Sequence, residues 1–136
     1  MAQYWLLKSE PKEYSYEDLE RDQRTVWDGV SNRLSLKYLN QMGPGDQAFI
    51  YHTGRVRAII GIADVVSSPY PDPEKEDPTL TVVDVEARRR LARPVTLKEV
   101  KADPGFAGFI LVRLPRLSVM PVSGTEWQQL LEMSGT

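Results

Sequence analysis

The sequence predicts an α+β fold in which a curved, barrel-like mixed sheet carries short helices on its outside. Three observations support this prediction. Five or six short apolar or β-branched segments are typical of strands, and four short segments carry helix signals. Two strand segments flank a short turn at 53–55, which indicates a central hairpin. The segments do not alternate as regular βαβ units, so a doubly wound parallel sheet is not expected.

The first two elements are a buried strand and a short capped helix. The apolar run Tyr4–Leu7 predicts a strand that stops before Pro11, because proline cannot donate to a β-ladder. Ser15 is a suitable N-cap for a helix over 15–20, and Asp18 follows three residues later, close to a capping box.

A short extended segment and an amphipathic helix come next. Residues 24–27 are expected to form an extended piece that ends at the Asp-Gly turn of 28–29. Three apolar residues then recur at three-residue spacing on one face, which favours a helix over 35–42: Leu36, Leu39 and Met42. The Gly-Pro-Gly-Asp sequence at 43–46 is expected to end this helix.

The middle of the chain predicts the hairpin and a long loop. Residues 47–52 and the β-branched run 56–66 are the two expected strands of this hairpin. Residues 67–78 contain four prolines and several acidic residues, so this segment is expected to be a loop and a possible lid.

The C-terminal part predicts two more strands and two more helices. Residues 81–87 alternate as a strand does, and 95–101 is expected to be a short helix capped by Thr96. Residues 117–122 predict a final strand whose proline implies an edge or an ending. Ser123 is expected to cap a C-terminal helix.

Composition indicates a single globular domain over residues 1–136, 41% of which are hydrophobic and 26% charged. The chain has no cysteine and one histidine, His52, which excludes disulfides, thiolate metal sites and multi-histidine metal centres. No metal or other cofactor is therefore expected. No apolar run reaches membrane-spanning length and no secretory signal is visible, so the expected location is cytoplasmic.

The charge balance limits how this chain could bind nucleic acid. There are 17 Lys and Arg residues against 19 Asp and Glu residues, a net charge of −2. Proteins that grip nucleic acid mainly through its phosphates are typically basic. Nucleic-acid binding would therefore depend on a local patch or on a pocket for one base, and a small free ligand is the other possibility.

The segment Trp27-Asp28-Gly29-Val30, followed by Asn32, is the most informative local feature. It offers a flat stacking surface, an acceptor, a close backbone approach and a bidentate amide within six positions, which suits a planar heterocycle. Asp28 could accept from an exocyclic amine, and Asn32 could match a Watson–Crick edge. The structural alternatives are a core tryptophan, an ordinary Asp-Gly turn and a helix-capping Asn32.

Residues at two strand ends are further candidates for lining such a pocket. Ser9 and Glu10 end the first strand, where they could contact a base or satisfy loop amides. Tyr51, His52 and Thr53 end a later strand, and His52 could donate to a base or simply be a hydrogen-bonded, half-buried histidine.

Several cationic side chains are candidates for contacts with the phosphate backbone. They are Lys8, Arg33, Arg55 and Arg57. The run Arg88-Arg89-Arg90, with Arg93, could also contact phosphates, although a solvated strand edge that resists aggregation is slightly favoured.

Catalysis is the rival class of function. Ser9, His52 and an aspartate could nominally form a Ser-His-Asp set, and Glu10 with Asp28 an acid–base pair. The sequence has no Gly-x-Ser-x-Gly elbow, no P-loop and no dinucleotide fingerprint. No catalytic residue is therefore assigned.

Six motifs in order resemble the EVE domain family over nearly the whole chain. They are Tyr-Trp-Leu-Leu-Lys-Ser-Glu-Pro at 4–11, Trp-Asp-Gly-Val-Ser-Asn at 27–32, Tyr-His-Thr at 51–53, Ile-Gly-Ile-Ala at 60–63, Tyr-Pro-Asp-Pro at 70–73 and Arg-Leu-Ser-Val-Met-Pro-Val at 116–122. This resemblance implies a PUA-like fold, related to that of YTH domains, which read a methylated adenine in RNA. It also implies binding of modified bases in DNA or RNA, notably modified cytosines.

The chain departs from the family pattern at three positions. Ser31 stands where the family usually has arginine, and Arg33 where it usually has tyrosine. Leu80 replaces a usual tryptophan, which would weaken or reshape an aromatic cage if that tryptophan forms one wall.

The resulting hypothesis is a module that captures a flipped, modified base, with Trp27 stacking on it and Asp28, Asn32 and Ser9 reading its edge. Two alternatives stay open: a small enzyme acting on a modified nucleotide or heterocycle, and a protein-interaction module that uses the 67–78 loop or the C-terminal helix. The base, the choice between DNA and RNA, and the oligomeric state do not follow from the sequence.

Overall fold

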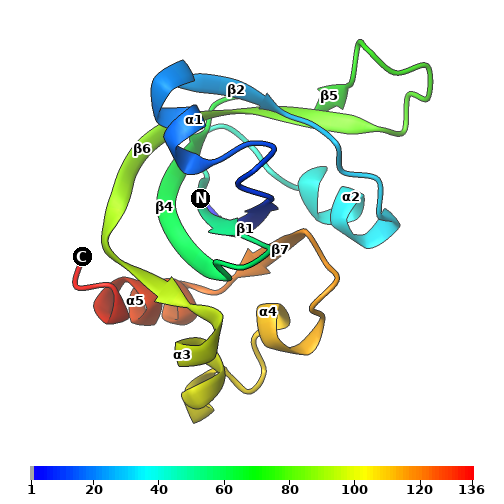
Figure 1. The fold of residues 1–136 in the computed structure, drawn as a ribbon. Helices are drawn as coiled ribbons and strands as arrows, with labels where there is room; N and C mark the ends of the chain where they lie inside the picture. Colours follow the sequence, from blue (N-terminus) through cyan, green and yellow to red (C-terminus); the bar gives the residue numbers. More distant parts are fainter. Residues whose placement is uncertain (1) are drawn as a thin grey trace.

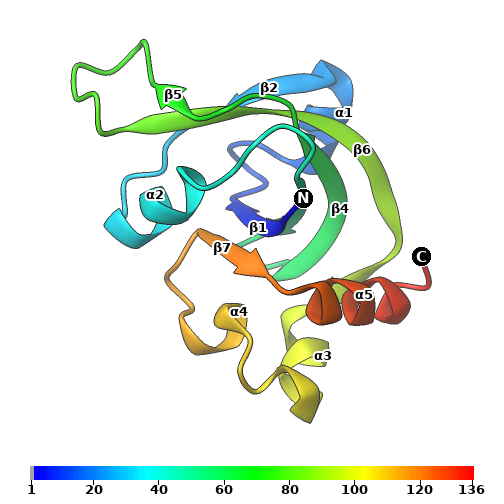
Figure 2. The ribbon, with the colours of Figure 1, turned by 180° about the vertical axis from the view of Figure 1, so that it is seen from behind.

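The computed structural model describes residues 2–136 and contains one curved mixed sheet surrounded by short helices (Figures 1 and 2). The strands are β1 (Tyr4–Ser9), β2 (Arg24–Trp27), β3 (Gln47–His52), β4 (Ala58–Val65), β5 (Tyr70–Pro71), β6 (Thr81–Thr96) and β7 (Val119–Val122). The helices are α1 (Tyr16–Asp22), α2 (Arg33–Leu39), α3 (Leu97–Ala102), α4 (Ile110–Arg113) and α5 (Gly124–Met133), with a 3-10 turn at Pro104–Phe106.

The sheet confirms the predicted fold class. Its strand order is β2-β6-β4-β3-β1-β7, and β5 pairs with β6 outside this path. β1 and β3 are parallel, whereas the other neighbours are antiparallel, including the predicted β3–β4 hairpin. β6 curves around β4 in Figure 1, which gives a barrel-like shape that stays open between β2 and β7. The prediction that the strand containing Pro121 lies at an edge is confirmed, because β7 ends the sheet.

The largest error in the predicted elements concerns β6, which continues to Thr96 instead of ending near residue 87. The basic run, for which a solvated strand edge was slightly favoured, lies within this strand, and carboxylates on neighbouring elements pair with two of its arginines. Arg88 lies 3.2 Å from Asp64 on β4, and Arg90 lies 2.7 Å from Glu20 on α1. Backbone pairing with β4, which continues as far as Ala58 opposite Thr96, keeps this polar segment in the sheet. The helix expected at 95–101 consequently begins at Leu97, with Thr96 as its cap as predicted.

The helix expected at 35–42 is displaced toward the N-terminus and becomes α2. The Asn32 side chain accepts a hydrogen bond from the Ser35 amide at 3.0 Å, so the helix starts at Arg33 and ends at Leu39. The predicted cap of α1 is confirmed, because Ser15 and Asp18 form a reciprocal capping box. Three short elements were missed, namely α4, the 3-10 turn at Pro104–Phe106 and the two-residue β5 inside the expected 67–78 loop.

Two apolar clusters lie on the two faces of the sheet. Side chains alternate along a strand, so Trp5 and Leu7 of β1 face one cluster and Leu6 faces the other. The first cluster is covered by α1 and α2, and the second by α3, α4 and α5. Buried Asp46 joins the elements around β1 by accepting hydrogen bonds from the Gln3 amide, the Trp5 indole and the Gly43 amide.

Candidate functional site

A cavity of about 480 Å³ opens where β1 ends beside the edge strand β2. Its walls come from the last residues of β1, the loop that leads to α1, and the turn that follows β2. We call it the aromatic cavity. It is lined by Lys8, Ser9, Glu10, Glu13, Tyr14, Thr25, Val26, Trp27, Asp28 and Gly29. The structure therefore brings together six of the residues predicted for ligand or backbone contacts, from two segments separated in the sequence.

Trp27 belongs both to the core and to the cavity wall. The side chain is 7% exposed and packs in the apolar cluster beneath α1 and α2. Its remaining surface lines the aromatic cavity. The next turn residue, Gly29, has a φ of +79°, a left-handed conformation that favours glycine. The predicted turn thus ends β2 directly beside the indole.

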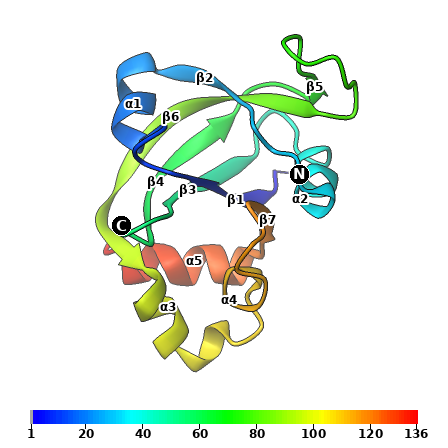
Figure 3. The ribbon, with the colours of Figure 1, turned by 45° about the vertical axis from the view of Figure 1, so that its right-hand side comes forward.

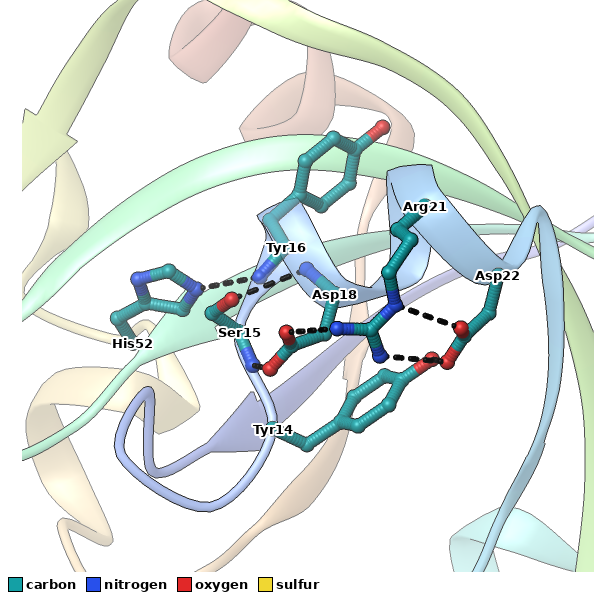
Figure 4. Close-up of polar contacts among 7 residues, drawn as sticks. All are labelled: Tyr14, Ser15, Tyr16, Asp18, Arg21, Asp22 and His52. Atoms are coloured by element: carbon teal, nitrogen blue, oxygen red, sulfur yellow. Dashed lines mark hydrogen bonds and ion pairs between the residues drawn. The ribbon is translucent and has the colours of Figure 1, made fainter.

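Tyr14 supplies a second aromatic wall that the sequence analysis missed. Its ring meets Trp27 edge-on, with 6.4 Å between ring centroids and an interplanar angle of 85°. Its hydroxyl donates to Asp22 at 2.9 Å (Figure 4). Its backbone carbonyl accepts from the Ser9 hydroxyl. Burial raises the pKa of the Tyr14 hydroxyl, so it stays a protonated donor at neutral pH. The one feature of the sequence that could have drawn attention to Tyr14 was its position directly before the helix cap Ser15.

An ion-pair cluster on α1 holds Tyr14 in place. The Arg21 guanidinium donates to Asp18 at 3.0 Å and to Asp22 at 2.9 Å, beside the tyrosine ring in Figure 4. The Arg21 hydrogen bond lowers the pKa of Asp22, which keeps this carboxylate ionised as the acceptor for the tyrosine hydroxyl. The aromatic wall is therefore attached to a folded helix, although it lies in a loop.

The lining of the aromatic cavity is acidic. It contains three carboxylates, Glu10, Glu13 and Asp28, against the single ammonium group of Lys8. Glu10 accepts from the Thr53 hydroxyl at 3.3 Å. Lys8 donates to the Pro115 carbonyl at 2.8 Å, and burial lowers the pKa of its ammonium group. Such a cavity suits a flat aromatic ligand that carries hydrogen-bond donors, and it disfavours a phosphate in its interior.

His52 lies beneath α1, outside the lining of the aromatic cavity. Its Nε2 accepts the Tyr16 amide at 3.0 Å, which satisfies one of the free donors in the first turn of α1 (Figure 4). Burial, with a smaller contribution from Arg90, lowers the pKa of this imidazole, so it is neutral at pH 7. In the structure His52 is therefore a hydrogen-bonded histidine that supports the start of α1. This corresponds to the structural alternative given for it in the sequence analysis.

Acidification is expected to weaken the fold through His52. Because the folded pKa lies below the unfolded value of 6.5, the unfolded chain binds the extra proton first. The contribution of His52 to stability is complete above pH 6.5 and is lost as the pH falls toward the lowered pKa. Urea unfolding of the wild type and of His52→Gln between pH 7.5 and 5.5 should show a steeper loss in the wild type. NMR titration of this single imidazole would contradict the prediction if its native pKa were 6.5 or higher.

The other predicted contact residues lie outside the aromatic cavity. Asn32 caps α2 and borders an apolar groove beside Leu114. Tyr51 and Thr53 line a neighbouring hollow that also includes Lys8. The remaining predicted cations are spread over further hollows, with Arg33 beside α2 and Arg55 and Arg57 beside α3.

Leu80, one of the three departures from the family pattern, lies beside α2. It packs against the first apolar cluster and lines a hollow with Arg33 and Lys37. The segment around it is tied to the sheet, because Tyr70 of β5 donates to Asp84 at 2.6 Å. The predicted 67–78 loop is thus anchored at its start, and its role as a lid stays a prediction.

The arrangement of Ser9 and His52 bears on the catalytic alternative. The two residues are register partners on the parallel strands β1 and β3. Their side chains nevertheless point to different partners, since Ser9 donates to the Tyr14 carbonyl and His52 accepts the Tyr16 amide.

Within residues 2–136, no group of three or more His, Cys, Asp or Glu side chains could hold a metal ion. In the same part of the chain, no helix is long and apolar enough to span a bilayer.

The open, curved mixed sheet with peripheral helices defines a PUA-like α+β module. An ASCH structure from Zymomonas mobilis shares this fold, with a TM-score of 0.61 and 14% identity over 96% of this chain and 95% of that one. The family model of the EVE domain matches residues 3–133, so the chain belongs to the EVE domain family.

Relatives of known sequence and structure agree with this assignment. Thymocyte nuclear protein 1 of Gallus gallus is 32% identical, covering 96% of this chain and 68% of the relative. The NMR structure of Rpa0253 from Rhodopseudomonas palustris has a TM-score of 0.93 and 38% identity over 98% of this chain and 94% of that one. The human THYN1 protein, solved in complex with 5-methylcytosine-containing DNA, has a TM-score of 0.90 and 29% identity over 99% of both chains.

Proposed function

We propose that this protein is a binding module for modified cytosine in DNA and that it holds the base, turned out of its stack, in the aromatic cavity. The observation that carries the proposal is the pairing of two aromatic walls with three carboxylates in one cavity. The human THYN1 protein, which shares this fold over 99% of this chain, is known in complex with 5-methylcytosine-containing DNA. The location that we propose for the protein is the cytoplasm, as the sequence predicts, whereas the human relative is named thymocyte nuclear protein 1.

Stacking on Trp27 supplies affinity for the captured base. The indole is fixed by the core on one side, so little side-chain entropy is lost when a base contacts it. Base–aromatic stacking contributes about 1–3 kcal/mol per base. Tyr14 closes the cavity at right angles to the indole and limits the orientation of the ring inside it.

Carboxylates in the cavity supply the preference for a base with an exocyclic amine. The 4-amino group of cytosine donates to acidic side chains, and Asp28 and Glu13 are exposed acceptors in the lining. Thymine and uracil present a carbonyl at the same position and would face these carboxylates with an acceptor. The cavity therefore discriminates cytosine from the other pyrimidines by hydrogen bonding.

Apolar surface in the cavity supplies the preference for the modification. Val26 is 44% exposed and lines the cavity next to Trp27. Burying one methyl group contributes roughly 0.8 kcal/mol, about a fourfold gain in affinity. The 5-methyl group is therefore expected to add affinity without a new hydrogen bond.

A fluorescence titration with matched oligonucleotides tests this function. Each DNA would carry one central cytosine, 5-methylcytosine, 5-hydroxymethylcytosine or thymine, or one N6-methyladenine. We expect the 5-methylcytosine oligonucleotide to bind about fourfold or more tightly than the cytosine one, and thymine to bind least. Tryptophan quenching reports the contact, and a competition assay with labelled DNA confirms the ranking.

Two results would contradict the proposal. Equal affinity for cytosine and 5-methylcytosine would remove the modified base as the ligand. A clear preference for N6-methyladenine would keep the module class but replace the base.

A further inference from the structure

Two basic hollows lie next to the aromatic cavity. The first, of about 320 Å³, is lined by Lys8, Tyr51, Thr53, Gly54, Arg57, Leu97, Lys101, Leu111 and Pro115. The second, of about 430 Å³, is lined by Arg55, Val56, Arg57, Thr96, Leu97, Lys98 and Lys101. Lys8 lines both the aromatic cavity and the first hollow, whereas Arg57 and Lys101 line both hollows. The three spaces therefore form a continuous series.

Five cations line these two hollows. We call them the basic track: Lys8, Arg55, Arg57, Lys98 and Lys101. Among the described residues 2–136, no carboxylate lines either hollow, although the whole chain has a net charge of −2. The hollow beside α2, by contrast, combines Arg33 and Lys37 with Asp77.

Among residues 2–136, the cations of the basic track form no ion pair with a carboxylate. Lys8 and Arg57 donate to the backbone carbonyls of Pro115 and Gly54. The ion pairs found within residues 2–136 use other arginines, at positions 21, 24, 88, 90 and 93. Three arginines of β6, Arg88, Arg90 and Arg93, are thus paired with carboxylates, whereas the basic track remains available for an anion.

Backbone hydrogen bonds hold the track in position relative to the cavity. The Thr53 amide donates to the Ser9 carbonyl at 2.9 Å, which ties the β3–β4 turn to the end of β1. The Leu97 amide donates to the Arg57 carbonyl at 2.8 Å, which ties the start of α3 to the same turn. Figure 3 shows α3 directly after the end of β6, below the sheet. Three elements distant in sequence therefore present their cations on one connected surface.

We propose that the phosphates of the DNA strand on one side of the captured base follow the basic track, and that α3 belongs to the nucleic-acid surface. This inference rests on the proposed function, because the captured base fixes where the strand enters the track. A phosphodiester beside a base in the acidic cavity needs a neighbouring cationic surface, and Lys8 lies at the boundary between the two. The track lies on one side of the base, so it gives the bound strand a defined direction.

The double variant Lys98→Ala/Lys101→Ala tests this surface. Both lysines are exposed on α3, and alanine favours helix formation, so the fold should be retained. The matched control is Lys75→Ala/Arg89→Ala, which removes two exposed positive charges outside the track. Both variants keep the aromatic cavity intact.

The measured quantity is the dependence of DNA affinity on salt concentration. Each lost phosphate contact lowers the slope of log K against log salt by about 0.7–0.9, so the α3 variant should lose about 1.4–1.8. The control should keep the wild-type slope. The ratio of affinities for 5-methylcytosine and cytosine should stay unchanged in both variants, because phosphate contacts carry no base information.

A second measurement tests the direction of the strand. Two single-stranded oligonucleotides would carry 5-methylcytosine at their 5′ or 3′ end, so that each has flanking phosphates on one side. We expect the α3 variant to weaken binding of only one of them. Equal slopes for the α3 variant and the control, with a preserved 5-methylcytosine preference, would overturn the track and leave the proposed function standing. Absence of that preference in the wild type would instead overturn the proposed function and this inference with it.

Discussion

Trp27→Leu is expected to lower the affinity for 5-methylcytosine DNA by roughly 5- to 150-fold, which corresponds to the loss of about 1–3 kcal/mol of stacking. Leucine keeps an apolar group in the first core cluster but removes the indole ring, part of which lines the aromatic cavity. Trp27→Ala would be a poorer probe, because truncating a buried tryptophan costs about 3–5 kcal/mol of stability. Titration of labelled DNA against each protein measures the effect, and Trp27→Phe should retain part of the affinity.

Trp127→Leu is the matched control for this prediction. Trp127 is 5% exposed, similar to the 7% of Trp27. It belongs to α5, however, and stacks on Phe49 in the other apolar cluster. Its replacement should reduce thermal stability and leave DNA affinity unchanged well below the melting temperature. Equal loss of DNA affinity in both leucine variants would mean that Trp27 acts only through the fold, and the stacking role would be rejected.

Gly61→Ala is expected to cause a large loss of stability for the addition of one methyl group, about 1–3 kcal/mol and toward the upper end of that range. A Cβ atom at this position of β4 would lie 2.5 Å from Cζ and 2.6 Å from Cε1 of Tyr16. The ring cannot move aside easily, because hydrogen bonds hold Tyr16 at both ends. The Tyr16 hydroxyl donates to the Ile62 carbonyl at 2.7 Å, and the backbone amide of Tyr16 donates to His52. Urea unfolding should show a lower midpoint with an unchanged m-value.

Two further variants separate this steric effect from a general effect of alanine. Gly124→Ala, at the first position of α5, meets no atom within 4 Å and should match or slightly exceed wild-type stability. In a Tyr16→Leu background the ring is absent, so adding Gly61→Ala should cost much less than in the wild type. If the Gly61→Ala cost were the same in both backgrounds, contact with the Tyr16 ring would not be its cause.

The parts of the fold that the sequence predicted well are those with local signals. The reciprocal capping box of Ser15 and Asp18 and the Thr96 cap depend on residues three positions apart, so both were readable. The β3–β4 hairpin followed from two apolar runs and a short turn. By contrast, the length of β6 depends on its backbone pairing with β4, which continues as far as Ala58 opposite Thr96, residues 38 positions apart.

The candidate site was predictable only in those parts that carry a local sequence signal. Trp27 and Asp28 were singled out because they stand together in one motif, and the end of β1 was singled out because Ser9 and Glu10 precede a proline. Tyr14 was missed because its contact with Trp27 joins a loop to the end of β2, two segments that no local pattern connects. The place of His52 beneath α1, rather than in the cavity lining, likewise depends on a contact across 36 residues.

The sequence by itself determined the α+β class, the helix caps, the central hairpin and the family, because each depends on short-range spacing or on the order of motifs along the chain. The tertiary structure alone decided which side chains share a cavity and which cations remain without a carboxylate partner. Pairing β1 with β3 and β2 with β6 brings distant segments together, and that pairing is set by the burial of both apolar clusters. Such long-range packing has no local signature, which is why the basic track that includes Lys98 and Lys101 emerged only from the folded chain.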